Sequence, residues 1–221
     1  MYRTATLFTL VAAVSAVSAA SAQQPGSSAA PFDEGTLPAT IESVEIHPIA
    51  AADLTCSTHS VHQGDPLFLG DALGSDCTVV RRDGGPAKRF AHTHEGDGSK
   101  NEDWFGWGET LLAPFDGVVV SVHLNETTNR PGERGQGPAS SIVFERKDGV
   151  RVLYGHIDDP QVARGDSVIA GQPVARIGNN GFSWFPHTHL GAWKGREPLQ
   201  IRFDPRALGR LQEERVRAAR K

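Results

Sequence analysis

The sequence has few of the features that a membrane, thiolate or nucleic-acid function would need. It contains only two cysteines, Cys56 and Cys77, and no Cys-x-x-Cys pair, so a thiolate metal site is not predicted. Acidic residues outnumber basic ones, 26 to 22, which argues against a general nucleic-acid binder because such proteins need a basic surface. No apolar run is long enough to span a bilayer.

The first 22 residues have the organisation of a secretory signal peptide. One cation, Arg3, precedes a short apolar run, and an Ala-Ser-Ala sequence closes the segment at residues 20–22. No cysteine follows this site, so lipid anchoring is not predicted. Cleavage would remove one of the 22 Lys and Arg residues and change the net charge from −4 to about −5. We therefore expect an exported protein, periplasmic or extracellular, in which Cys56 and Cys77 form a disulfide.

The remaining chain divides into four parts. Residues 23–40 are rich in Ser, Ala, Pro and Gly and are predicted to be a flexible leader, and residues 41–89 a small β-rich extension. Residues 90–205 contain many short strand patterns separated by glycine and proline, including a strong hairpin signal at Lys147-Asp148-Gly149. Residues 206–221 are a charged tail, either a surface helix or a frayed end. The fold class predicted is mainly β, an antiparallel sandwich-like domain.

Histidines and one aspartate supply the candidate chemistry. His187 and His189 are two residues apart, so in a strand both side chains would project from the same face. His156, Asp103 and the pair His92 and His94 lie upstream. A catalytic zinc site needs about three His or carboxylate ligands and an open position for water, and further imidazoles can move protons. From residue types alone, a zinc site and a set of unrelated surface histidines are equally good interpretations. His47, His59 and His62 are expected to be surface or structural residues.

Several stretches together resemble the lysostaphin-type zinc metalloendopeptidases, which cut peptide cross-links of bacterial cell walls. The resemblance covers roughly residues 90–205. The matching stretches are Gly108 to Val119, Tyr154-Gly155-His156, the Gly-Asp-x-Val-x-x-Gly-Gln block within 162–172, and Gly178 to Ser183 followed by Pro186-His187-Thr188-His189. One such stretch would be weak evidence, but these occur in the family's order. The resemblance implies a duplicated hybrid motif fold.

The resemblance also implies roles for individual residues. By position, Asp103 and His189 would be ligands of Zn²⁺, and His156 and His187 would be the catalytic imidazoles. The family commonly has His-x-x-x-Asp at its first ligands, and this chain departs from that pattern. His94 is preferred to His92 as the third ligand, with the glycine-rich segment 95–102 as an insertion before Asp103. Asp97 is a lesser alternative to Asp103.

The function that the resemblance implies is hydrolysis of peptide bonds in peptidoglycan through a metal-activated water. The alternatives are a non-catalytic binding or regulatory module of the same fold in cell-wall remodelling, and a peptidase for secreted protein substrates. A lipoyl or biotin carrier would share the Gly-Asp-x-Val turn, but it needs an exposed lysine, and no lysine lies between Lys147 and Lys194. Peptidoglycan peptides are thus the expected partner. The aromatic residues of 104–107 and 184–185 are expected to be mostly core.

Overall fold

The computed structural model describes residues 40–60, 69–82, 90–218 and 220. These residues belong to one compact unit, Thr40–Lys221. The predicted signal peptide, the predicted leader up to residue 39, and His62 lie outside the described residues. Among the residues that are described, no helix has the length and apolar character needed to cross a membrane.

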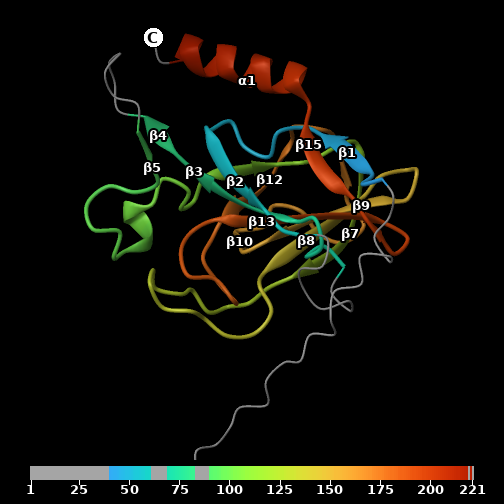
Figure 1. Cartoon of the computed structure of the whole chain (residues 1–221). Coiled ribbons are helices and arrows are strands. Elements are labelled where there is room, and N and C mark those ends of the chain that lie inside the picture. The colour runs from blue at the N-terminus through green and yellow to red at the C-terminus, as the bar shows by residue number, and fades with distance from the viewer. Residues whose placement is uncertain (1–39, 61–68, 83–89, 219, 221) are drawn as a thin grey trace, which may run out of the picture. The chain divides into compact units, whose positions relative to one another are not determined.

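An eight-stranded antiparallel sheet forms the centre of the fold (Figure 1). Its strands, in spatial order, are β11 (Ser167–Val168), β7 (Gly117–His123), β8 (Ser141–Glu145), β9 (Val150–Gly155), β13 (Thr188–Lys194), β3 (Ser75–Val79) and β2 (Leu54–Thr58), with β14 (Glu197–Pro198) paired to β13. The predicted mainly β, antiparallel fold class is confirmed.

Smaller sheets complete the unit. They are β10 (Ile157–Asp158), β12 (Pro173–Ile177) and β6 (Thr110–Leu112) in one antiparallel sheet, β1 (Ser43–Ile46) parallel to β15 (Gln200–Phe203), and β4 (Arg81–Arg82) paired with β5 (Ala91–His92). A short 3₁₀-helix, η2, covers Asn101–Asp103.

The hairpin signal at residues 147–149 is confirmed, because β8 and β9 pair in antiparallel register around it. Gly149 has a φ of +84°, a value that glycine adopts without strain, and Asp148 accepts hydrogen bonds from the Arg146 guanidinium. Side chains alternate between buried and less buried along β8, as period-2 patterning requires. The hairpin thus places one face of both strands in the core.

Tyr154 joins two sheets within the core. It is fully buried on β9, its ring packs edge-on against Phe144 of β8, and its hydroxyl donates a 2.9 Å hydrogen bond to the Leu112 carbonyl of β6. Because a buried hydroxyl without a partner is costly, this bond fixes the spacing of the two sheets.

The predicted extension is part of the main sheet. β3 pairs directly with β13, β2 pairs with β3, and the Cys56–Cys77 disulfide joins residues that face each other across β2 and β3. The predicted disulfide is present. The predicted β-rich extension over 41–89 contributes β2 and β3 to this sheet, because strand pairing distant in sequence brings them beside β13.

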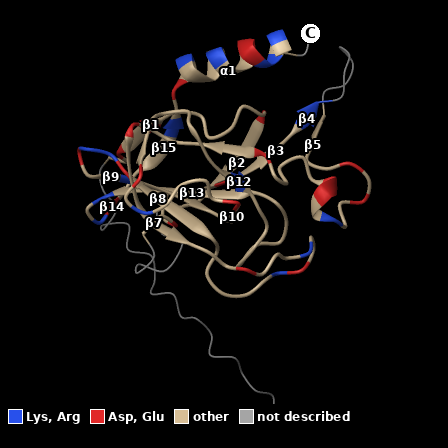
Figure 2. Ribbon diagram, turned by 180° about the vertical axis from the view of Figure 1, so that it is seen from behind, with Lys and Arg blue, Asp and Glu red and all other residues tan. Residues whose placement is uncertain are grey.

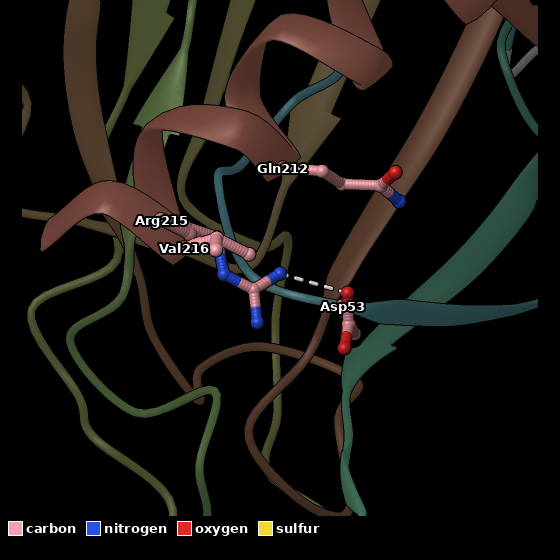
Figure 3. Close-up of a pocket in the computed structure, with 4 residues that line it drawn as sticks. All are labelled: Asp53, Gln212, Arg215 and Val216. Carbon is pink, nitrogen blue, oxygen red and sulfur yellow. Dashed lines mark hydrogen bonds and ion pairs between the residues drawn. The ribbon is translucent and has the colours of Figure 1, made fainter. Parts of the chain in front are cut away.

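The charged C-terminal stretch is a helix, α1 (Pro205–Ala218), in which basic and acidic residues are interspersed (Figure 2). Arg215 forms a 2.7 Å ion pair with Asp53, just before β2 (Figure 3). Gln212 and Val216 line the same surface pocket. Of the two interpretations of this tail, the surface helix is the one observed.

Candidate metal centre

Three side chains bring their ligand atoms together on the β2–β3–β13 part of the main sheet. His59, Asp76 and His189 each offer one nitrogen or oxygen, and these atoms lie within 4.8 Å of one another. Asp76 Oδ1 is 2.9 Å from His189 Nδ1, and Asp76 Oδ2 is 3.1 Å from His59 Nε2. The carboxylate therefore bridges two imidazoles.

Strand register places these groups. Asp76 on β3 is directly opposite His189 on β13 in the antiparallel pairing. His59 directly follows β2, and its backbone N–H donates to the Gly74 carbonyl at 2.8 Å, which continues the β2–β3 hairpin. The Cys56–Cys77 disulfide ties the same two strands beside Asp76. The hairpin thus carries two of the three groups and is covalently closed next to them.

Backbone carbonyls orient both imidazoles from behind. His59 Nδ1 is 3.3 Å from the Asp71 carbonyl, and His189 Nε2 is 3.2 Å from the Gly70 carbonyl. Carbonyl and carboxylate oxygens both only accept hydrogen bonds, so each ring faces an acceptor at both of its nitrogens, with the shorter distance on the Asp76 side. A metal ion on the Asp76 side would leave the ring proton on the nitrogen that faces the carbonyl. This is the outer-shell arrangement that metal-binding histidines commonly have.

The charge balance of the centre favours a cation. Burial raises the pKa of Asp76, but hydrogen bonds and charge from His187 and His189 outweigh burial and hold this pKa well below its ordinary value. Burial lowers the pKa of His189, but the Asp76 carboxylate outweighs it and holds this pKa above the ordinary value of 6.5. A proton at His189 therefore occupies the place that a metal ion would take. The mixed nitrogen and oxygen donors suit Zn²⁺.

Two further imidazoles lie beside this centre. His187 Nε2 is 3.7 Å from Asp76 Oδ1, and the His156 ring is 4.5 Å from the His187 ring between centroids. His187 Nδ1 donates to the Phe185 carbonyl at 2.8 Å, and His156 Nδ1 donates to the Asn180 carbonyl at 2.8 Å. Each ring therefore keeps Nε2 free to accept a proton when it is neutral.

His156 occupies an uncommon backbone position between β9 and β10, with a φ of +57°. Burial, with a smaller contribution from the charge of His187, lowers the pKa of His156 to about 3. This imidazole is therefore neutral at physiological pH and able to act as a base. The positive φ directs the chain sharply at the point where the ring is held, as is frequent at functional sites.

The His-x-His prediction can be compared directly with the structure. His187 and His189 both lie near Asp76, so they face the same region as predicted for an extended segment. Thr188 between them instead donates to the Gly155 carbonyl, and Leu190 is fully buried in the core.

His94 and Asp103 lie outside this cluster, and their role as metal ligands stays a prediction. Asp103 Oδ2 accepts a hydrogen bond from the Lys100 backbone at the start of η2. The His94 ring packs on Trp104, and its buried Nδ1 has no hydrogen-bond partner. The segments of His94 and Asp103 do lie together, since the Glu95 N–H donates to the Asp103 carbonyl. Among the described residues, however, only the His59, Asp76 and His189 group meets the spacing for a metal ion.

Asp97 and His92, the alternatives to Asp103 and His94, also lie outside the cluster. Asp97 Oδ1 accepts from the Ser99 N–H and serves a local turn. The His92 ring lies 5.4 Å from the Phe105 ring between centroids.

The sequence analysis did not select Asp76 as a candidate ligand, and it assigned His59 a surface or structural role. The signal available was their position on a β-rich segment closed by the predicted disulfide, since Asp76 precedes Cys77 and His59 follows Cys56 by three residues. The sequence pattern did not indicate which strand this hairpin would pair with.

The aromatic cluster divides between packing and exposure. Trp104 and Phe185 stack with ring centroids 4.8 Å apart, and Phe185 also contacts the His187 ring. Phe182 and Trp184, by contrast, are more than half exposed. Of the five aromatic residues expected to be mostly core, one is buried, three are half-buried and one is exposed: Phe105, then Trp104, Trp107 and Phe185, then Trp184.

One family model matches part of the chain. Residues 102–201 match the model of peptidase family M23. This agrees with the resemblance predicted for residues 90–205, although His59 and Asp76 precede the matched segment. No curated protein matches the chain.

Several solved structures are similar. A zinc-containing peptidase from Vibrio cholerae is 19% identical over 69% of this chain, with a TM-score of 0.42, and only 37% of that longer chain is covered. The catalytic domain of lysostaphin from Staphylococcus simulans is 18% identical, covering 68% of this chain and 93% of that domain, with a TM-score of 0.39. A chain of the SpoIIQ–SpoIIIAH pore-forming complex is 14% identical, covering 72% and 89%, with a TM-score of 0.41. The match to the family model covers residues 102–201, fewer than half of the chain.

Proposed function

We propose, from the premise that residues 102–201 match peptidase family M23, that this chain is a zinc metallopeptidase that hydrolyses peptide bonds of peptidoglycan. The observation that carries the proposal is the convergence of a bridged His–Asp–His cluster with two further imidazoles. Those five side chains come from segments far apart in sequence, and packing alone does not require so many titratable groups to meet.

His59, Asp76 and His189 would hold the ion. They supply the usual number of protein ligands for a catalytic zinc site, and the Asp76 side chain is 37% exposed, so the centre is accessible to solvent. A bound Zn²⁺ would make water acidic near neutral pH and would polarise the carbonyl of the bond to be cut.

His156 and His187 would move protons. Both rings have Nδ1 engaged by a backbone carbonyl, so Nε2 is the atom that accepts a proton from water and later returns one to the leaving amine. Burial keeps His156 neutral, and its ring lies close to that of His187. His156 therefore starts in the basic form that the first proton transfer needs.

The substrate and the compartment form the finer part of the proposal. The family resemblance favours wall peptides, and the signal-peptide pattern together with the disulfide favours an exported protein.

The test measures bound zinc and the loss of turbidity of purified cell walls, using protein expressed from the full coding sequence. We expect wild-type protein to bind zinc stoichiometrically and to clear the walls, releasing new amino termini. His189→Ala should lose zinc and activity. His187→Ala should keep zinc and lose activity. His123→Ala is the matched control, because His123 is exposed at the end of β7 and should leave both unchanged.

Each other outcome rejects a defined part of the proposal. Zinc binding with cleavage of a protein panel but not of walls would reject the substrate. Neither zinc nor cleavage would reject the enzyme and favour the non-catalytic module.

A further inference from the structure

One loop, residues 178–186, supplies the acceptors for both proton-moving imidazoles. The carbonyl of Asn180 receives His156 Nδ1–H, and the carbonyl of Phe185 receives His187 Nδ1–H, each at 2.8 Å. Ser183 Oγ lies 3.3 Å from His187 Nδ1 and donates to the same Phe185 carbonyl. The positions of these two carbonyls therefore determine which ring nitrogen is protonated and where Nε2 points.

A second segment holds this loop from the side through Asn129. The side-chain amide of Asn129 donates to the Gly181 carbonyl at 2.9 Å and to the Ser183 carbonyl at 3.0 Å. Its backbone N–H donates to the Asn179 carbonyl at 2.7 Å. Asn129 is buried, at 7% exposure, so these bonds form away from competing water.

The two carbonyls that Asn129 binds lie, in sequence, between the two carbonyls that accept from His156 and His187. Gly181 and Ser183 follow Asn180 and precede Phe185. The Asn129 amide therefore binds the loop between the two carbonyls that orient His156 and His187. Without this amide, the Gly181 carbonyl would keep only the Ser183 N–H at 2.8 Å, and the Ser183 carbonyl only the Gly135 N–H at 3.4 Å. The loop would lose both bonds that tie its midpoint to the Asn129 side chain.

We propose that Asn129 is a positioning residue for the hydrolytic reaction, acting through loop 178–186 on His156 and His187. The inference rests on the proposed function. Asn129 lies outside the reacting groups, and its contribution is to keep both Nε2 atoms aimed at the centre. Geometry of this kind matters because a displacement of about 1 Å can reduce turnover by about 100-fold.

Gly135 supports the same assignment independently. A Cβ built at Gly135 would overlap the Asn129 Oδ1 atom, so residue 135 must lack a side chain for the amide to lie where it does. Gly135 does not have a positive φ, so an alanine there would adopt the backbone and act through this overlap. Gly135→Ala therefore displaces the amide without changing Asn129 itself.

The first experiment compares Asn129→Ser with Asn125→Ser. Asn125 is a matched control, because its amide also donates to two carbonyls, those of Gln136 and Pro138, but these lie within its own loop. For Asn129→Ser we expect kcat to fall by about 10- to 100-fold with unchanged zinc content. Asn125→Ser should keep kcat near the wild-type value.

The second experiment measures the tautomers of the His156 and His187 imidazoles directly. Long-range ¹H–¹⁵N correlation spectra should show His156 and His187 as Nδ1–H tautomers in wild-type protein and in Asn125→Ser. In Asn129→Ser and in Gly135→Ala at least one ring should lose this single tautomer. Thermal unfolding of all variants shows that they are folded at the temperature used.

Wild-type tautomers and kcat in both Asn129→Ser and Gly135→Ala would overturn the inference, as would an equal loss in Asn125→Ser. An inactive wild-type protein would reject the proposed function instead. The tautomer measurement would still decide the role of Asn129, since it needs no turnover.

Discussion

Asp76 lies directly opposite His189 across the β3–β13 pairing, and its Oδ1 atom is 2.9 Å from His189 Nδ1. The strand that pairs with the His-x-His strand therefore belongs to the β2–β3 hairpin. The segment around residue 103 does not pair with it. Matched substitutions separate the two ligand sets.

Asp76→Asn is expected to abolish zinc binding, whereas Asp103→Asn should retain it. Outer-shell changes usually weaken metal affinity by about 10- to 100-fold, so loss of a direct ligand should exceed that range. His59→Gln and His94→Gln form a second matched pair with the same expected difference. Zinc titration with a competing chelator measures all four. Loss of zinc in Asp103→Asn and His94→Gln, with retention in the other two, would restore the ligand set predicted from sequence.

Zinc affinity should decrease as the pH is lowered. The Asp76 carboxylate stabilises protonated His189 and holds its pKa above 6.5, and a metal ligand must be deprotonated, so protons compete with zinc from above that pH downward. The pKa of Asp76 lies below its ordinary value, so this carboxylate stays ionised throughout. Titrations from about pH 8 to about pH 5.5 should show affinity falling up to about tenfold per pH unit for each displaced proton. Constant affinity across this range would show that zinc does not displace a proton from His189.

The disulfide is expected to support the metal centre as well as the fold. Cys56→Ser combined with Cys77→Ser opens a link between residues 21 apart, which should reduce the free energy of unfolding by about 3 kcal/mol. Zinc affinity should fall too, because the freed hairpin carries His59 and Asp76. Urea unfolding and zinc titration give the two readouts.

The next cross-strand pair provides the control for that experiment. Thr55→Ser with Thr78→Ser alters β2 and β3 one position away but leaves the disulfide in place. It should have a smaller effect on zinc. Equal zinc affinity in the cysteine variant and the wild type would show that strand pairing alone preforms the site.

Tyr154→Phe should destabilise the protein without removing its function. The variant leaves the buried Leu112 carbonyl without its hydroxyl donor, at a cost of about 1–3 kcal/mol. Tyr154 makes its hydrogen bond inside the core, so zinc content and kcat should remain near wild type at temperatures where the variant is folded. Urea unfolding and the turbidity assay check this, and a large loss of kcat in folded protein would assign Tyr154 a role beyond packing.

Local pattern was enough for much of the fold. Alternation along residues 141–145 and 150–155, with a turn containing Gly149 between them, predicts a hairpin because side-chain period and turn chemistry are encoded by neighbouring residues. The same local logic brings His187 and His189 to one side. The disulfide was predictable because the chain has only one pair of cysteines.

The sequence by itself determined a mainly β chain, its hairpin, its disulfide, and a His-x-His segment set among family-like turns. The tertiary structure alone decided which distant groups meet that segment. Asp76 and His189 are separated by 113 positions, and His59 reaches them only because β2 and β3 pair onto β13. Strand partners are selected by the packing of whole faces and by register, and a shift of one residue would turn Asp76 to the other side of the sheet.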